Sequence, residues 1–304
     1  MHGTHVPVLL REVLDLLAPR PGEVVLDGTV GGGGHARVLL ERIAPDGRLI
    51  ALDRDAQALE RAADVLPAGE PGRCVLRHAN YADFAAVLDE LGVAGVDAAL
   101  LDLGVSSFQL DQAERGFSFM ADAPLDMRMD RTQSRTAADL VNELDEEELA
   151  DVFYTYGEER FSRRIAARIV EERQREPIRT TGQLARIVLR ARPARVRGQR
   201  WHIHPATRVF QALRICLNRE LQSLEAFCEA IPGRLNPGGR VGIISFHSLE
   251  DRIVKNAFRR LAASEEFQLV TRKPVTSSKR EQKENPRSRS AKLRVVSRNR
   301  AEES

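Results

Sequence analysis

Apolar residues in this 304-residue chain show two different patterns, continuous runs and helical spacing, which alternate along the first hundred residues. Continuous apolar runs, several of them rich in β-branched residues, predict buried strands at residues 24–27, 48–53, 74–78 and 96–103. Apolar residues at helical spacing predict helices at residues 11–17, 36–43, 56–66 and 84–91. Strands that alternate with helices in this way predict a parallel sheet with helices on both faces.

The pattern changes after about residue 104, and no strong strand signal recurs before about residue 205. Polar, helix-forming segments occupy this stretch, at residues 137–142, 145–156, 162–174 and 181–191. Asp145 and Glu148 have the spacing of a capping box at the start of the second segment. We therefore predict a helical subdomain, residues 106–205, inserted into an α/β domain whose two parts are residues 1–105 and 206–304.

The α/β pattern resumes in the last hundred residues. Residues 206–229 carry apolar positions at helical spacing and predict one long helix. A fifth strand is predicted at residues 240–246, followed by a helix at 249–261 that has Ser248 as its N-cap. The last predicted elements are two paired strands, at residues 266–272 and 292–297, and a mobile polar loop between them, at residues 276–290.

Composition and cysteine usage restrict the class of protein. Apolar residues make up 42% of the chain, enough for a folded core, and the formal net charge is only +2. The three cysteines form no Cys-x-x-Cys pair, which argues against a zinc ribbon or a disulfide framework. The N-terminus lacks the regions of a signal peptide, and no run approaches about 20 apolar residues. We therefore expect a cytoplasmic protein without a membrane-spanning segment.

A glycine-rich loop after the first strand is the clearest candidate for a ligand site. Residues 31–34 are four consecutive glycines, which allow the backbone to approach a ligand closely at a helix N-terminus. Asp53 ends the next strand, twenty positions after Gly33, a spacing at which a carboxylate can hold both hydroxyls of a nucleotide ribose. The alternative for Asp53 is a helix-capping role.

The identity of the cofactor depends on the acid that precedes the glycines. Residues 31–36 fit G-x-G-x-x-G/A, so a nicotinamide-dependent dehydrogenase is one interpretation. Asp27 lies directly before the glycine turn, where a carboxylate would repel a pyrophosphate and attract a cationic amino group. S-adenosylmethionine has such an amino group and no phosphate, and the sequence therefore favours it.

Two further residues are candidates for contacts with the substrate. Asp102 ends the fourth strand, at the edge of a parallel sheet where substrates enter; the alternative is a capping or structural role. His247 follows the fifth strand and is a candidate base or base-stacking group, or else a polar loop residue.

Arginine-rich stretches indicate a polyanionic partner. Residues 186–219 contain nine arginines and no acid, and residues 271–304 contain eleven Lys or Arg against four acids. Within the first stretch, aromatic and guanidinium groups alternate in the manner of a nucleic-acid contact, at Arg195, Arg197, Arg200 and Trp201. A solvated basic face fits this stretch equally well, and a non-catalytic RNA-binding assembly factor is a third interpretation of the chain.

Ordered blocks along nearly the whole chain resemble the ribosomal RNA small subunit methyltransferase H family of bacteria. The blocks are HVPVLL at residues 5–10, the glycine loop at 31–35, LDLGVSS at 101–107, ERGFSF at 114–119, PLDMRMD at 124–130, RVFQALRI at 208–215, SFHSLEDR at 245–252 and SAKLR at 290–294. The resemblance implies a class I (Rossmann-like) methyltransferase sheet with an inserted helical subdomain.

The resemblance also implies an activity, N4-methylation of one cytidine in the decoding region of small-subunit (16S) ribosomal RNA. The implied methyl donor is S-adenosylmethionine, no metal is needed, and the partner is small-subunit ribosomal RNA within the assembled or assembling small subunit. Whether naked RNA also serves as substrate stays open. Carried over by position, the cofactor contacts are Gly33, Gly34, His35, Asp53, Tyr81, Asp102 and Gln109. Ala36 and Phe108 replace a Ser and a Pro that are common in the family, and neither change removes a cofactor contact.

The family motifs do not identify a general base. We take Asp102 as the candidate catalytic group, because a carboxylate near the cytosine amine would orient or activate it. The oligomeric state stays open, with a homodimer as one alternative.

Overall fold

The computed structural model describes residues 7–66, 72–192 and 204–300. The chain divides into two compact units: unit 1 contains Met1–Gly104 and Leu221–Ser304, and unit 2 contains Val105–Glu220. Among the described residues, no helix is both long and apolar enough to cross a bilayer. The proposed RNA contacts Arg195, Arg197, Arg200 and Trp201 lie outside the described residues.

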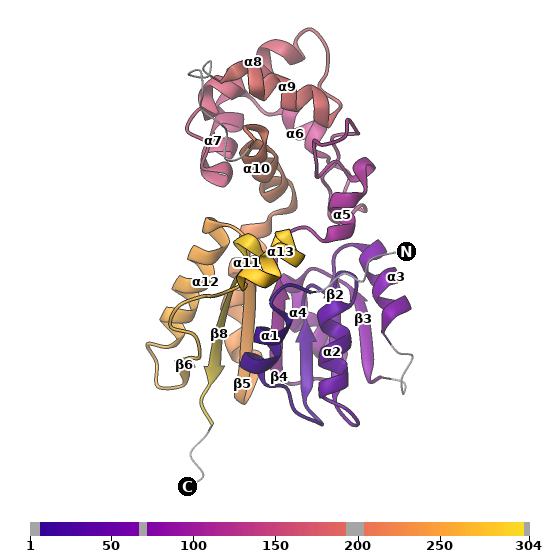
Figure 1. Cartoon of the computed structure of the whole chain (residues 1–304), viewed down its shortest axis with the longest axis vertical. Helices are drawn as coiled ribbons and strands as arrows, with labels where there is room; N and C mark the ends of the chain where they lie inside the picture. The colour runs from indigo at the N-terminus through magenta and orange to yellow at the C-terminus, as the bar shows by residue number, and fades with distance from the viewer. Residues whose placement is uncertain (1–6, 67–71, 193–203, 301–304) are drawn as a thin grey trace. The chain divides into compact units, whose positions relative to one another are not determined.

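One mixed sheet forms the centre of unit 1 (Figure 1). Its strands, within the described residues, are β1 (Val24–Asp27), β2 (Arg48–Asp53), β3 (Cys74–His78), β4 (Val96–Asp102), β5 (Leu235–Ser245), β6 (Phe267–Leu269), β7 (Val275–Thr276) and β8 (Lys292–Arg298). The strand order is β3-β2-β1-β4-β5-β8-β6, with β7 also paired to β8. Strands β1 to β5 are parallel, and β8 runs antiparallel to β5, β6 and β7. The predicted α/β fold and the final strand pair are confirmed.

Helices cover both faces of this sheet, as the continuous apolar runs of its strands require. They are α1 (Leu10–Leu17), α2 (Gly34–Arg42), α3 (Ala56–Val65), α4 (Phe84–Glu90), α11 (Glu220–Ala230) and α12 (Ser248–Leu261). Unit 1 also contains the short helix α13 (Lys279–Glu284), which has no buried residue. Val13 of α1, Leu39 of α2 and Ala62 of α3 belong to the core on one face. Phe84 of α4, together with α11 and α12, supplies the core on the other face.

Unit 2 is helical, and its core is separate from the two cores of the sheet. Its helices are α5 (Ser107–Asp111), α6 (Ala137–Glu143), α7 (Glu146–Gly157), α8 (Ser162–Arg173), α9 (Thr181–Ala191) and α10 (Ala206–Asn218). The predicted capping box at the start of α7 is confirmed, because Asp145 Oδ1 accepts from Glu148 N at 2.8 Å and Glu148 Oε2 accepts from Asp145 N at 2.9 Å. Similar boxes begin α5, α6 and α9.

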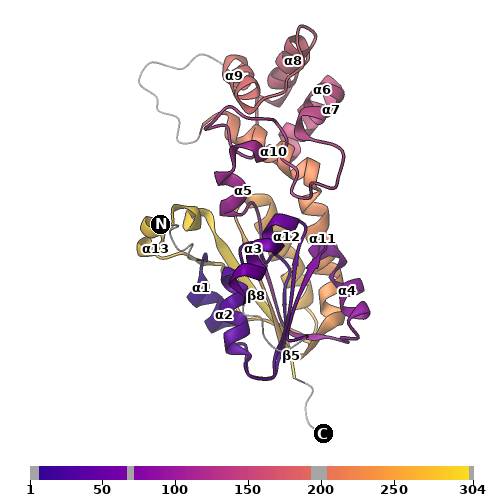
Figure 2. The same ribbon diagram turned by 90° about the vertical axis from the view of Figure 1, so that its right-hand side faces the viewer.

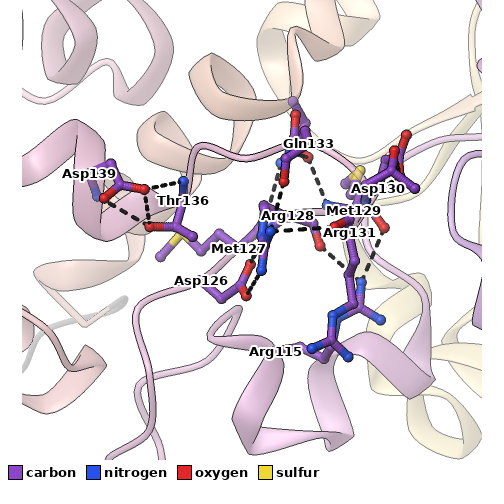
Figure 3. Close-up of polar contacts among 12 residues, drawn as sticks. Arg115, Asp126, Met127, Arg128, Met129, Asp130, Arg131, Gln133, Thr136 and Asp139 are labelled. Atoms are coloured by element: carbon purple, nitrogen blue, oxygen red, sulfur yellow. Dashed lines mark hydrogen bonds and ion pairs between the residues drawn. The ribbon is translucent and has the colours of Figure 1, made fainter.

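A network of polar contacts holds the loop before α6 (Figure 3). Asp126 accepts two hydrogen bonds from the Arg128 guanidinium, each 2.8 Å long, so the pair is bidentate. The same guanidinium donates to the carbonyl of Gln133 at 2.7 Å. Buried Arg115 donates to the carbonyls of Arg128 and Met129, at 2.9 and 3.2 Å. The loop is therefore held mainly through its backbone carbonyls, and its conformation follows from a few arginine side chains.

The single long helix predicted for residues 206–229 is wrong. The chain forms α10 and α11 instead, and Arg219 between them has a left-handed backbone with φ of 50°. Val209 and Leu213 of α10 belong to the core of unit 2, so this unit extends to Glu220 rather than ending at residue 205. The helical period continues through the break, which is why the apolar pattern alone did not reveal it.

Two local predictions in unit 1 also need correction. The N-cap of α12 is His247 and not Ser248, and its capping-box partner is Glu250. Residues 276–290 were predicted as a mobile loop, but they contain α13 and the 3-10 helix Pro286–Ser290. Ser278 caps α13 through Glu281 N, and the hydroxyl of buried Ser277 donates to Ser288 O at 2.7 Å. Polar side-chain contacts, rather than an apolar stripe, hold this segment.

Candidate functional site: carboxylates at the ends of three strands

Three acids end three neighbouring strands of the sheet. Asp27, Asp53 and Asp102 are the last residues of β1, β2 and β4, and β1 lies between the other two strands. Because the carboxyl ends of parallel strands meet at one edge, the fold brings these side chains together. Their electrostatic interactions agree with this. The charge of Asp53 raises the pKa of Asp27, and the charge of Asp27 raises the pKa of Asp102.

The glycine loop is fixed by two of these acids. Asp27 Oδ1 accepts from Thr29 N at 3.1 Å, and Asp53 Oδ2 accepts from Gly31 N at 2.9 Å. Gly33 has a φ of 81°, and a Cβ on it would lie only 3.3 Å from the Cα of Ala62 in α3. A side chain at Gly33 would therefore be strained and crowded, so the loop needs glycine there to keep its backbone next to the strand ends.

Asp53 does not cap α3, so the capping alternative is wrong. The N-cap is Asp55, whose side chain accepts from Gln57 N, while Asp53 Oδ1 accepts from Asp55 N at 2.9 Å. Each oxygen of Asp53 thus accepts one backbone N–H. A carboxylate oxygen has two lone pairs, so Asp53 can still accept from two neighbouring hydroxyls of a ribose.

Asp102 is tied to the glycine loop through a residue that the sequence analysis missed. Its backbone N–H donates to the hydroxyl of Thr29 at 2.6 Å, which couples the end of β4 to the loop after β1. The cap of the following helix α5 is Ser106, so Asp102 has no capping role there. Thr29 lies between the first strand and the glycine loop, but its contact with the end of β4 has no sequence signal.

Burial keeps all three carboxyls basic. Desolvation raises the pKa of Asp102 to about 8, helped by the charges of Asp27 and Glu250. Desolvation also raises the pKa of Asp27 to about 7 and that of Asp53 to about 6, although backbone N–H donors oppose it at both sites. One oxygen of Asp27 and one of Asp102 are buried without a hydrogen-bond partner, whereas the Asp102 side chain as a whole keeps 26% of its exposure. These two oxygens are available to a cationic or N–H ligand.

Glu250 is the second residue that the sequence analysis missed. It is buried at the start of α12, and its Oε2 accepts from Phe246 N at 2.8 Å and from His247 N at 3.2 Å. Its charge is one of the causes of the raised pKa of Asp102. Its position three residues after the cap is a capping-box signal, but that spacing does not predict an effect on another strand.

His247 has a structural position in this arrangement. Its Nδ1 accepts from Glu250 N at 3.4 Å, and its Nε2 lies 3.2 Å from Glu250 Oε1. Its side chain keeps 10% of its exposure. The contacts therefore account for His247 as a helix cap, and its role toward RNA stays a prediction.

His35 and Tyr81 flank the strand ends. His35, the second residue of α2, is buried; its Nδ1 lies 3.6 Å from Asp102 Oδ2 and its Nε2 lies 2.9 Å from Val8 O. Tyr81 is buried in the 3-10 helix after β3, with its ring edge against Phe227 at 6.0 Å between centroids. Both predicted contacts thus lie in unit 1, with the acids.

Gln109 lies in unit 2. It is buried as the N3 residue of the α5 capping box, where its Oε1 accepts from Ser106 N at 3.0 Å. This contact accounts for its burial, and its place in a cofactor site stays a prediction.

The residues present fit S-adenosylmethionine better than a dinucleotide. A dinucleotide would bring a pyrophosphate to the glycine loop, next to carboxylates that already repel one another. A cationic amino group and a sulfonium would instead find the partnerless oxygens of Asp27 and Asp102. The hydroxyl acceptors of Asp53 and the glycine at position 33 suit the adenosine half of the same molecule.

Comparison with known proteins agrees with this chemistry. The sequence profile described as the MraW methylase family matches residues 2–299. A protein of Syntrophotalea carbinolica named Ribosomal RNA small subunit methyltransferase H is 54% identical, covering 97% of this chain and 98% of the relative. Proteins of the same name from a Cyanothece species and from Deinococcus radiodurans are 56% and 53% identical, covering 97% and 96% of this chain and 94% and 89% of the relatives.

The glycine loop, the three strand-end acids and the helical unit between β4 and β5 thus occur in a chain that aligns with these proteins over nearly its whole length. The chain belongs to the MraW methylase family.

Proposed function

We propose that this chain transfers the methyl group of S-adenosylmethionine to the exocyclic N4 of a cytidine in the decoding region of small-subunit (16S) ribosomal RNA. The observation that carries the proposal is the identity of 50–56% over nearly the full length to relatives that share one name. The partnerless oxygens of Asp27 and Asp102 support it from the side of the chemistry.

Gly33, Gly34, His35, Asp53, Tyr81, Asp102 and Gln109 are the cofactor contacts of this proposal. Asp53 holds the ribose hydroxyls, and Asp27 faces the amino group of the amino-acid moiety. When bound, S-adenosylmethionine supplies a methyl group that is activated by its positively charged sulfur. Unit 2, with Arg195, Arg197, Arg200 and Trp201 in its sequence, contacts the RNA together with His247.

Asp102 orients the nucleophile. The lone pair of the cytosine amine is delocalised into the ring, so an acceptor on its N–H favours attack on the methyl carbon. Transfer of the methyl carbon from the sulfur to N4 would leave the amine with one N–H proton to lose. The Oδ1 of Asp102, which is buried without a hydrogen-bond partner in the ligand-free protein, accepts this proton once the bound cation has displaced the carboxyl's own proton. Positioning of the two reactants supplies the remaining acceleration.

The cysteines take no covalent part in this reaction. Burial raises the pKa of all three thiols, to about 12 for Cys228, so the nucleophilic thiolate is disfavoured at Cys74, Cys216 and Cys228. Attack at the exocyclic nitrogen needs no adduct on the ring.

Transfer of tritium from labelled S-adenosylmethionine tests the activity. Small ribosomal subunits lacking the modification should become labelled, and nuclease digestion should release the label as N4-methylcytidine. Asp102→Asn should lower the rate about 100-fold or more at saturating cofactor, because the acceptor for the N–H proton is lost. Asp64→Asn, at an exposed position of α3, is the matched control and should keep the wild-type rate.

The same assay separates the competing interpretations. A dehydrogenase would reduce a nicotinamide and leave the RNA unlabelled, and an RNA-binding assembly factor would bind the subunit without transfer. Label in a different nucleoside would refute the N4 assignment, and an unchanged rate in Asp102→Asn would refute the role of Asp102.

The proposal extends to the state of the substrate and of the enzyme. The RNA is methylated within the assembled or assembling subunit, in the cytoplasm, so naked RNA should be labelled more slowly than subunits. Light scattering of the purified protein distinguishes a monomer from the homodimer that we keep as an alternative.

A further inference from the structure

The three residues that lead into α1 contact the start of α2 and the helix α13, both in unit 1. The ring of Pro7 lies against the glycine loop, since a Cβ on Gly34 would come within 2.7 Å of Pro7 Cγ. The carbonyl of Val8 accepts from His35 Nε2 at 2.9 Å. The N–H of Leu9 donates to Glu281 Oε1 at 2.8 Å, although Glu281 is 272 positions away in the sequence. This entry segment, residues 7–9, therefore connects α13 to the glycine loop and the first turn of α2 (Figure 2).

The entry segment is held in an unfavourable conformation. Leu9 is fully buried and has a left-handed backbone, with φ of 54° and ψ of 31°, and no side chain caps α1 at this position. The left-handed region costs a residue with a Cβ roughly 1–2 kcal/mol. Such a conformation persists only where the surroundings impose it. The acceptor that Glu281 provides for Leu9 N is one of these constraints, because a buried N–H without a partner is destabilising.

The entry segment in turn sets the state of His35. A carbonyl can only accept, so Val8 O requires a proton on Nε2 of His35. The other ring nitrogen, Nδ1, is then the one that faces Asp102 Oδ2, at 3.6 Å. The bond to Val8 therefore fixes the ring orientation and, in the neutral imidazole, the tautomer that Asp102 meets.

We propose that Glu281 is a positioning residue for methyl transfer, which acts through Leu9 and Val8 to hold His35 against Asp102. The proposal rests on the proposed function, in which His35 and Asp102 contact the cofactor. It gives the C-terminal segment around α13, which the sequence suggested only as a loop, a defined role at the site. Glu281 itself touches neither reactant in this role.

The first test compares two substitutions at Glu281 with a control on the same helix. Glu281→Ala removes the acceptor for Leu9 N and should raise the dissociation constant for S-adenosylmethionine about tenfold. Glu281→Gln keeps an acceptor oxygen and should stay within about twofold of wild type. Glu284→Ala is the matched control, because Glu284 is exposed and forms an ion pair with Arg280 of the same helix, and it should change nothing.

Two further measurements separate positioning from a general loss of stability. A double-mutant cycle should show that Glu281→Ala has no additional effect on cofactor affinity in a His35→Ala background, because the effect passes through that ring. Nitrogen-15 NMR of the ligand-free protein should show His35 with its proton on Nε2 in wild type and Glu281→Gln, and a mixture of ring states in Glu281→Ala.

The outcomes distinguish this inference from the proposed function. If wild type does not bind S-adenosylmethionine, the proposed function fails, and the NMR spectra of the ligand-free protein still decide whether Glu281 controls His35. If wild type binds but Glu281→Ala keeps both the affinity and the His35 spectrum, the positioning role is refuted alone. An equal loss of affinity in the presence and absence of the His35 ring would also refute it.

Discussion

Affinity for S-adenosylmethionine should increase with pH between 6.0 and 7.5, and the structure gives the sign. The pKa of Asp27 is raised to about 7 and that of Asp102 to about 8, both chiefly by desolvation, so each carboxyl carries a proton over much of this range. A positively charged ligand binds the ionised carboxylate more strongly. Binding must therefore release protons, and lowering the proton concentration favours the complex.

The size of the effect follows from the two pKa values. If only the deprotonation step with a pKa near 7 is linked to binding, the affinity should rise about 8-fold from pH 6.0 to 7.5, or about 1 kcal/mol. If the step near 8 is linked as well, the rise should be about 200-fold, or about 3 kcal/mol. The two carboxyls act on one another, so these steps belong to the pair rather than to either residue. The range stops at pH 7.5 because an α-amino group itself titrates at about 7.7–8.0.

Calorimetry in buffers of different ionisation enthalpy measures the protons released. At pH 6.5 we expect roughly 0.8 proton if one step is linked and roughly 1.7 if both are. Asp27→Asn should lose about one of these steps and flatten the pH dependence, whereas the control Asp64→Asn should retain both. A dissociation constant that does not change between pH 6.0 and 7.5, with no proton released, would refute the linkage and the assignment of Asp27 to the cationic group.

Two further predictions concern the cofactor ribose and the RNA. Asp53→Ala should weaken S-adenosylmethionine binding by roughly 1.5–3 kcal/mol, or about 10- to 150-fold, because it removes the hydroxyl acceptors and the partner of Gly31 N; unchanged calorimetric affinity in a folded variant would contradict this. A triple variant replaces Arg195, Arg197 and Arg200 by Gln. It should raise the dissociation constant for the small subunit and lower the salt slope of binding by about 0.7–0.9 per lost phosphate contact. Its affinity for the cofactor should be unchanged. A salt slope equal to that of wild type would leave only the solvated basic face.

The sheet was predictable from sequence because its strands are buried on both faces. A strand of that kind is apolar at consecutive positions, so β1, β2 and β4 stand out as continuous runs that end in an acid. The meeting of Asp27, Asp53 and Asp102 then follows from parallel pairing alone. These were the residues that the sequence analysis placed in the site.

The remaining features depend on contacts between positions that are far apart in the sequence. Thr29, which follows β1, accepts from Asp102 N at the end of the neighbouring strand β4, and Glu281 accepts from Leu9 N near the other end of the chain. The spacing of apolar residues cannot reveal such bonds. In the sequence, a polar residue exposed in a loop looks the same as a polar residue that is hydrogen-bonded to a buried backbone group. The mobile loop predicted at residues 276–290 is wrong for this reason, since the polar composition that suggested mobility supplies the anchoring side chains.

The burial of the acids ties the stability of the protein to its ligand. Between the ordinary pKa of 3.8 and the raised values of about 7 for Asp27 and about 8 for Asp102, the folded protein binds more protons than the unfolded chain. The free energy of unfolding therefore decreases as pH rises through this interval, by up to about 1.4 kcal/mol per pH unit for each carboxyl. A cation bound beside the carboxylates lowers their pKa and reverses this loss, so S-adenosylmethionine should stabilise the protein more at pH 7.5 than at pH 6.0. The desolvation that weakens the ligand-free fold is thus the same property that gives a cationic ligand its affinity.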